Sequence, residues 1–85
     1  MNLFYELISD NAGRKIRRER KSWGMSRRRL AKLSGTDKET IEYIENGYVC
    51  MLDANLLRRI SEALDVSMFD FFKKQLTFEE MLQII

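Results

Sequence analysis

The sequence contains no histidine, no proline and a single cysteine, Cys50, among its 85 residues. Without histidine it lacks the commonest general base near neutral pH, the histidine-containing nucleophilic dyads and the zinc-protease helix. One cysteine excludes an internal disulfide and a zinc site built from cysteines. We therefore expect a protein that is not an enzyme and that uses no metal or cofactor.

Long apolar runs are also missing. No stretch approaches the ~18–20 apolar residues that cross a bilayer, and residues 1–10 carry no Lys or Arg, unlike a secretory signal peptide. Hydrophobic residues make up 45% of the chain and charged residues 33%, a balance typical of one small globular domain. We expect a cytoplasmic protein without a membrane partner.

Positive charge is concentrated in one part of the chain. Residues 14–38 hold eleven bases and two acids, a net charge of +9, whereas residues 39–85 hold four bases and nine acids, a net charge of −5. The basic segment has two interpretations. It can form a surface that meets a polyanion such as nucleic acid, or a solvated helix face, because Lys and Arg are common exposed helix formers.

Hydrophobic spacing and capping signals predict an all-α fold. The tract YVCML over residues 48–52 resembles a strand, but it is short and has no partner strand. It is expected to pack under the following helix or to form a dimer contact. The predicted helices cover residues 2–9, 12–22, 27–34, 37–46 and 54–64, a short segment from Ser67 to Phe72, and the segment from Thr77 to the C-terminus.

Several helix starts are marked by residues that cap the backbone amides of the first turn. Ser26 and Asp53 precede two of the predicted helices and are expected to cap them. Thr36 and Glu39 have the spacing of a capping box, in which each side chain bonds the backbone amide of the other residue. We expect this box to begin the helix over residues 37–46.

Residues 16–47, which read IRRERKSWGMSRRRLAKLSGTDKETIEYIENG, resemble the phage-repressor helix-turn-helix of the Cro/C1 or XRE family. Residues 54–72 resemble the fourth and fifth helices of the same five-helix domain. The resemblance covers about residues 12–72, and it departs from the family at Asp65, where glycine commonly ends a helix in the left-handed conformation. It implies a transcriptional regulator, usually a dimer, that reads operator DNA in the major groove.

The resemblance divides the chain into an N-terminal extension over residues 1–11, a helix-turn-helix domain over residues 12–72 and a C-terminal helix over residues 73–85. Apolar residues in both extensions lie outside the five-helix unit. Either one or both ends build a homodimer, or the two ends pack against each other. The residues concerned are Leu3, Phe4, Leu7 and Ile8, and Leu76, Phe78, Met81, Leu82, Ile84 and Ile85.

Base-reading positions of the family fall at the start of helix 37–46 and one turn later. The resemblance places Lys38, Glu39 and Tyr43 there, with Glu42 nearby. Lys38 can donate to guanine and Glu39 can accept from cytosine N4, while Tyr43 can reach a phosphate or a thymine methyl. In the alternative, Glu39 is held in the capping box, Lys38 and Glu42 form a surface pair, and Tyr43 flanks the core.

The resemblance also implies phosphate contacts. Arg27 stands where family members have a glutamine that contacts phosphate, and it is followed by Arg28 and Arg29. A guanidinium can hold a phosphate through two hydrogen bonds, although part of this triplet can face solvent only. Asn46 matches a further phosphate-contacting position. Arg27, Arg28 and Asn46 are therefore the candidate phosphate contacts.

One charged residue falls on an apolar stripe. The stripe of helix 12–22 consists of Ala12, Ile16, Arg20 and Trp23, so Arg20 needs a partner. In the family an Arg of this helix pairs with a Glu at the end of the reading helix, which corresponds to Glu45. Breaking a buried pair costs ~3–5 kcal/mol, whereas a surface pair contributes ~0–1 kcal/mol.

These observations favour a sequence-specific regulator, a repressor, whose partners are double-stranded DNA and a second copy of the chain. The alternative is a protein-binding module on the same fold, such as an antitoxin or an antagonist of another regulator, that uses its exposed apolar ends. Acidic Glu39 and Glu42 favour this alternative because carboxylates repel phosphates. The +9 segment favours DNA.

Overall fold

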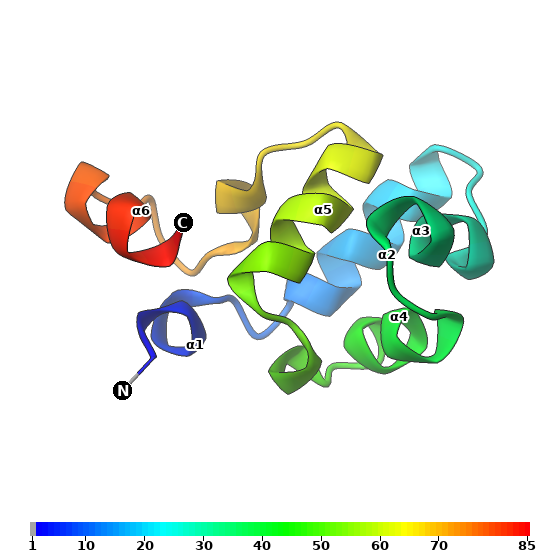
Figure 1. Cartoon of the computed structure of the whole chain (residues 1–85), viewed down its shortest axis with the longest axis horizontal. Coiled ribbons are helices and arrows are strands. Elements are labelled where there is room, and N and C mark those ends of the chain that lie inside the picture. Colours follow the sequence, from blue (N-terminus) through cyan, green and yellow to red (C-terminus); the bar gives the residue numbers. More distant parts are fainter. Residues whose placement is uncertain (1) are drawn as a thin grey trace.

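The computed structural model describes residues 2–85, and this part of the chain is helical apart from one isolated bridge between Ile8 and Phe72 (Figure 1). The all-α prediction is confirmed. The segment 48–52 contains a 3-10 turn and no strand. The elements are α1 (Leu3–Leu7), α2 (Ala12–Ser22), α3 (Arg27–Ser34), α4 (Lys38–Glu45), η1 (Val49–Met51), α5 (Ala54–Leu64), η2 (Met68–Phe71) and α6 (Phe78–Ile84).

The helices α3 and α5 begin at the capping residues that the sequence predicts. The Ser26 hydroxyl accepts a hydrogen bond from the amide of Arg29 at 3.0 Å, and the Asp53 carboxylate accepts one from Leu56 at 2.7 Å. At the end of α5, Asp65 adopts the left-handed conformation, with φ 57°. The backbone of Asp65 therefore adopts a conformation that costs glycine less strain than it costs aspartate.

The predicted capping box at the start of α4 is wrong. The N-cap residue is Asp37, whose carboxylate accepts a hydrogen bond from the Thr40 amide at 2.8 Å. The helix begins one residue later than a box from Thr36 requires, so the third helical position is Thr40 and not Glu39. The Glu39 side chain consequently stays exposed on the first turn of α4.

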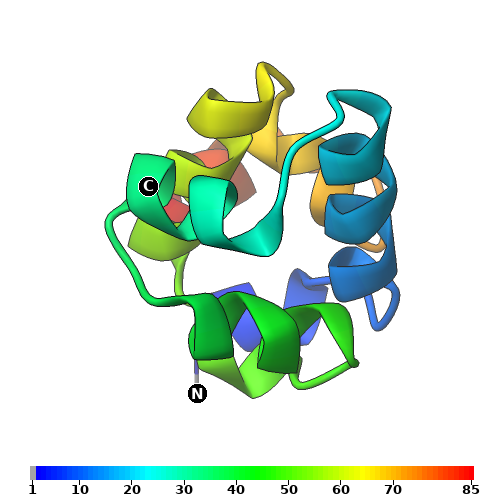
Figure 2. The ribbon, with the colours of Figure 1, turned by 90° about the vertical axis from the view of Figure 1, so that its right-hand side faces the viewer.

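A single cluster of buried apolar side chains forms the core, and α3 packs against both α4 and α5. Figure 2 looks onto the end of the molecule at which α2, α3 and α4 gather. The most deeply buried members of the cluster include Ile16, Leu30, Ile41, Ile44, Leu57, Ile60 and Leu64.

Trp23 does not belong to the inward stripe of α2, and this prediction is wrong. The helix ends at Ser22, and Trp23 is 58% exposed. Its indole nitrogen donates a hydrogen bond of 2.9 Å to the carbonyl oxygen of Leu64. Trp23 therefore lies across the C-terminal end of α5, where it satisfies a carbonyl that the helix leaves unpaired.

Gly13 allows α2 and α4 to approach closely. A Cβ atom built on Gly13 would lie 1.8 Å from the carbonyl oxygen of Ile44, which is far inside van der Waals contact. Because the obstacle is backbone, a side chain at this position requires α2 and α4 to move apart. The close approach brings the C-terminal half of α4 against the first turn of α2.

The two ends of the chain pack against each other, which was one of the two outcomes considered. Helices α1 and α6 are in contact, and Phe4, Ile8, Leu76 and Ile84 join the common core. Both helices lie at the opposite end of the molecule from α3 and α4 (Figure 1). The outer face of α6 remains uncovered in the described chain, with Phe78 74%, Leu82 59% and Ile85 77% exposed.

Candidate nucleic-acid interface

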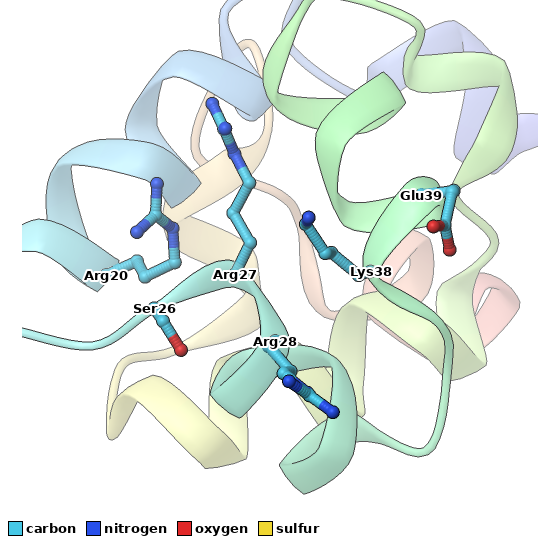
Figure 3. Close-up of a pocket in the computed structure, with 6 residues that line it drawn as sticks. All are labelled: Arg20, Ser26, Arg27, Arg28, Lys38 and Glu39. Carbon is cyan, nitrogen blue, oxygen red and sulfur yellow. The ribbon is translucent and has the colours of Figure 1, made fainter.

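The first turns of α3 and α4 border a common hollow of about 740 Å³ (Figure 3). In Figure 3 Lys38 extends from α4 toward Arg27 of α3, whereas Arg28 and Glu39 point away from these two side chains. Most of the charged groups around the hollow are basic, so an anion is attracted to it. Its lining consists of Arg20, Ser26, Arg27, Arg28, Lys38 and Glu39.

Arg20 and Glu45 form a buried ion pair behind this hollow. The guanidinium Nε lies 2.7 Å from Glu45 Oε2 and Nη2 lies 2.9 Å from Oε1, so the pair is bidentate. The remaining terminal nitrogen donates to the carbonyl oxygen of Met25 at 2.7 Å. Arg20 is thereby accommodated on the apolar stripe of α2, and it joins that helix to α4 and to the turn before α3.

Arg27 shares the same carboxylate. Its Nε donates to Glu45 Oε1 at 3.0 Å, and its side chain is 30% exposed while that of Glu45 is fully buried. This second pair is not predictable from the sequence, because the two residues are 18 positions apart on different helices. No local spacing rule brings Arg27 and Glu45 together.

The exposed face of α4 carries the predicted base-reading residues Lys38, Glu39, Glu42 and Tyr43, while Ile41 and Ile44 bury the opposite face. Within residues 2–85 no side-chain hydrogen bond or ion pair engages the three charged residues, so the surface pair considered for Lys38 and Glu42 is not formed. A second hollow runs along this face and is lined by Glu39, Glu42, Tyr43 and Asn46.

Tyr43 projects from the reading face and does not enter the core. It is 52% exposed, and its ring packs edge-on against that of Tyr48 with the centroids 5.8 Å apart. Tyr48 contacts one side of the Tyr43 ring, and about half of Tyr43 remains exposed to solvent. The interpretation in which Tyr43 flanks the core is therefore wrong.

A negative charge is held at the start of α4. Hydrogen bonds from the side chain and the backbone amide of Thr40 lower the pKa of Asp37 below its ordinary value of 3.8. The Asp37 carboxylate is consequently charged at neutral pH and interacts favourably with the N-terminal end of the helix dipole. Its charge therefore supports the start of α4.

Residues 2–85 contain neither a cluster of metal-ligating side chains nor a membrane-spanning helix. No group of three or more His, Cys, Asp or Glu residues in this part of the chain is placed to hold a metal ion. No helix among the same residues is long and apolar enough to cross a membrane. Cys50 is exposed on η1 and is not among the residues that line the basic hollow.

Comparison with known proteins identifies the family. The family model described as Helix-turn-helix matches residues 16–71, which include α3, α4 and α5. The chain therefore belongs to the Cro/C1-type helix-turn-helix family, also called the XRE family. The domains of this family bind DNA and serve in regulation. No curated protein matches the chain.

Solved structures similar to this chain include two of the protein HppE bound to its substrate. The iron(II) form, in substrate form 1, has a TM-score of 0.67 and 28% identity and covers 75% of this chain. The cobalt(II) form has a TM-score of 0.68 and 28% identity and covers 76%. This chain spans 36% of each HppE chain. The metals and the substrate are those of HppE.

Proposed function

We propose that this protein is a sequence-specific DNA-binding repressor that places α4 in the major groove. The observation that carries the proposal is the solvent-facing surface of α4, where Lys38 has no partner within residues 2–85, beside a hollow whose lining is mostly basic. A helix reads base edges when one face is anchored to the core and the other is free. A domain bound to its operator in this way lowers transcription by occupying the site.

The proposed contacts divide into two groups. Arg27, Arg28 and Asn46 contact phosphates and set the register, whereas the residues of the α4 face read bases. Lys38 donates to guanine and Glu39 accepts from cytosine N4, and each good contact discriminates by ~1–3 kcal/mol. The base-reading residues are Lys38, Glu39, Glu42 and Tyr43.

We infer further that the protein acts as a homodimer through the outer face of α6. Phe78, Leu82 and Ile85 are spaced by four and three residues, so they form one stripe along the helix. This face lies at the far end of the molecule from α3 and α4 (Figure 1), and a contact there leaves both reading helices accessible. Two reading helices related by a two-fold axis match two half-sites.

A titration of the protein into fluorescent duplex DNA, followed by anisotropy at several salt concentrations, tests the proposal. Affinity is expected to fall steeply with salt. The logarithm of the binding constant should decrease linearly with the logarithm of the salt concentration, with a slope of ~0.9 per phosphate neutralised. Arg27→Ala is expected to weaken binding to all sequences alike, and Lys38→Ala to relax preference at one base position. Lys73→Ala, which removes an exposed base near α1 and α6, serves as the control and should leave affinity nearly unchanged.

The second candidate is a protein-binding module, such as an antitoxin or an antagonist of another regulator. It is favoured by Glu39 and Glu42, because two carboxylates on the reading face repel phosphates, and by the uncovered apolar face of α6. Absence of DNA binding even at low salt would contradict the DNA-binding proposal and favour this candidate. Binding that is equally weakened by Lys73→Ala and Arg27→Ala would contradict the placement of the interface.

A further inference from the structure

Arg20 and Arg27 use their guanidinium groups differently, although both pair with Glu45. Each of the three nitrogens of Arg20 donates to a protein acceptor, and the residue is 7% exposed. The Nε–Nη2 edge of Arg20 is therefore occupied by Glu45, and little of the residue reaches solvent. Arg20 contributes charge to the hollow mainly from the interior.

Arg27 is bound through its Nε alone. Within residues 2–85 no acceptor engages its two terminal nitrogens, and the side chain is 30% exposed where it lines the hollow. The edge formed by these two nitrogens is the one that holds a phosphate through parallel hydrogen bonds. Arg27 is thus tethered on one side and free on the side that can bind an anion.

The tether itself is rigid. The Glu45 side chain is fully buried, and its Oε1 accepts from Arg20 at 2.9 Å and from Arg27 at 3.0 Å. Because Arg20 fixes the carboxylate, the carboxylate in turn restricts the rotamers of Arg27, and less side-chain entropy is lost when a ligand binds. Two guanidinium groups and one carboxylate leave a net charge of +1, so the attraction for an anion is retained.

We propose that Glu45 is a positioning residue, which holds Arg27 in the orientation that clamps a DNA phosphate. This role is additional to the ion pair with Arg20, and it rests on the proposed DNA-binding function. A flexible arginine would supply the same charge without the fixed geometry.

The first test compares two substitutions that conserve charge, Arg27→Lys and Arg28→Lys, in the anisotropy titration with one mixed-sequence duplex. A lysine ammonium cannot donate to Glu45 from one nitrogen and hold a phosphate with two others. We expect Arg27→Lys to bind about tenfold more weakly with an unchanged salt slope, because the charge is retained. Arg28 is a proposed phosphate contact on an exposed side chain, and no buried carboxylate orients it within residues 2–85. Arg28→Lys is therefore expected to weaken binding less than Arg27→Lys does, because the ammonium keeps the charge and no fixed geometry is lost.

The outcome separates this proposal from the proposed function. If the unmodified protein binds DNA and Arg27→Lys weakens binding no more than Arg28→Lys, charge alone suffices and the positioning role is overturned. Tighter binding by Arg27→Lys would also overturn it, because Glu45 would then be restraining Arg27 from the phosphate. Absence of binding by the unmodified protein is a different result, which contradicts the DNA-binding function.

A double-mutant cycle supplies the second test. Glu45→Gln is measured with Arg27 present and in the Arg27→Ala background, at a temperature where circular dichroism shows each protein to be folded. If Glu45→Gln lowers DNA affinity by removing the partner of Arg20, the loss is equal in both backgrounds. If it lowers affinity by releasing Arg27, the loss occurs only when Arg27 is present. We expect Glu45→Gln to weaken DNA binding about tenfold only when Arg27 is present. Equal losses in both backgrounds would overturn the positioning role, and the lysine comparison decides the matter if Glu45→Gln does not fold.

Discussion

Arg20 and Glu45 face each other through two hydrogen bonds of 2.7 and 2.9 Å, although 25 residues separate them in the chain. The pair joins α2 to α4, with the Arg20 side chain 8% exposed and the Glu45 side chain fully buried. Each guanidinium nitrogen of Arg20 has a hydrogen-bond acceptor, since the third nitrogen donates to the carbonyl oxygen of Met25. Among residues 2–85, no buried side-chain nitrogen or oxygen lacks a hydrogen-bond partner. The pair thus holds the reading helix against the rest of the domain.

Removing Glu45 is expected to destabilise the fold strongly. Glu45→Ala leaves the buried Arg20 charge without its carboxylate, and we expect the free energy of unfolding to fall by ~3–5 kcal/mol. Urea denaturation followed by circular dichroism measures this change. The control is Glu62→Ala, which breaks the exposed pair with Arg58 at 3.2 Å and is expected to cost ~0–0.5 kcal/mol. Equal costs for the two variants would show that the buried pair contributes no more than a surface pair.

Gly13→Ala is expected to destabilise the protein although alanine favours helices. The added methyl group would overlap the Ile44 carbonyl oxygen, 1.8 Å away, and overpacking of this kind costs ~1–3 kcal/mol or more. This exceeds the gain in helix propensity of about 1 kcal/mol. The free energy of unfolding in urea checks the sign. Arg17→Ala, an exposed change on the same helix, should stay within ~0.5 kcal/mol; a stabilised Gly13→Ala would contradict the close approach.

Acid is expected to weaken the start of α4 through Asp37. The pKa of this carboxyl is below the ordinary value of 3.8 in the folded protein because Thr40 donates hydrogen bonds to it. The resulting stability is fully present above the unfolded pKa and is lost as pH falls through the lower folded pKa. Asn caps a helix without titrating, so Asp37→Asn should remove this part of the acid sensitivity.

Urea midpoints measured for the original protein and for Asp37→Asn across acid and neutral pH test this expectation. Other carboxyls, including Glu80, titrate equally in both proteins, so their effects cancel in the difference between midpoints. The difference in midpoint should be constant above the unfolded pKa of Asp37. At lower pH the original protein should lose stability relative to the Asn variant. A difference that does not change with pH would contradict the role of the charged cap.

The outer face of α6 is expected to determine the oligomeric state. Leu82→Lys places a charge in the middle of the stripe formed with Phe78 and Ile85, and it should convert a dimer into a monomer. Because Leu82 is 59% exposed, the stability of the fold itself should change little. Light scattering during size-exclusion chromatography gives the mass directly, compared with 10.1 kDa for one chain. Gln83→Lys adds the same charge to an exposed neighbouring position and should leave the dimer intact.

The local parts of this fold were predictable from short segments of sequence. Ser26 and Asp53 act on amides three residues away, and Gly35 ends α3 in the left-handed conformation, with φ 72°. Such interactions depend on neighbours within one helical turn, so their signals are present in the chain itself. The all-α class followed from these signals and from hydrophobic spacing, whereas the helix-turn-helix family followed from the resemblance of residues 16–47 and 54–72. The same reasoning misplaced the start of α4 by one residue, because Thr36 and Asp37 are both competent caps.

The arrangement around the reading helix was decided only by packing between distant segments. Glu45 meets arginines that lie 25 and 18 residues away, and Gly13 meets the backbone of α4. No periodicity links these positions, since their contacts depend on the angle and separation of whole helices. Local rules therefore predicted which residues begin and end the helices, while tertiary packing determined that one carboxylate holds two arginines beside the DNA-facing surface proposed here.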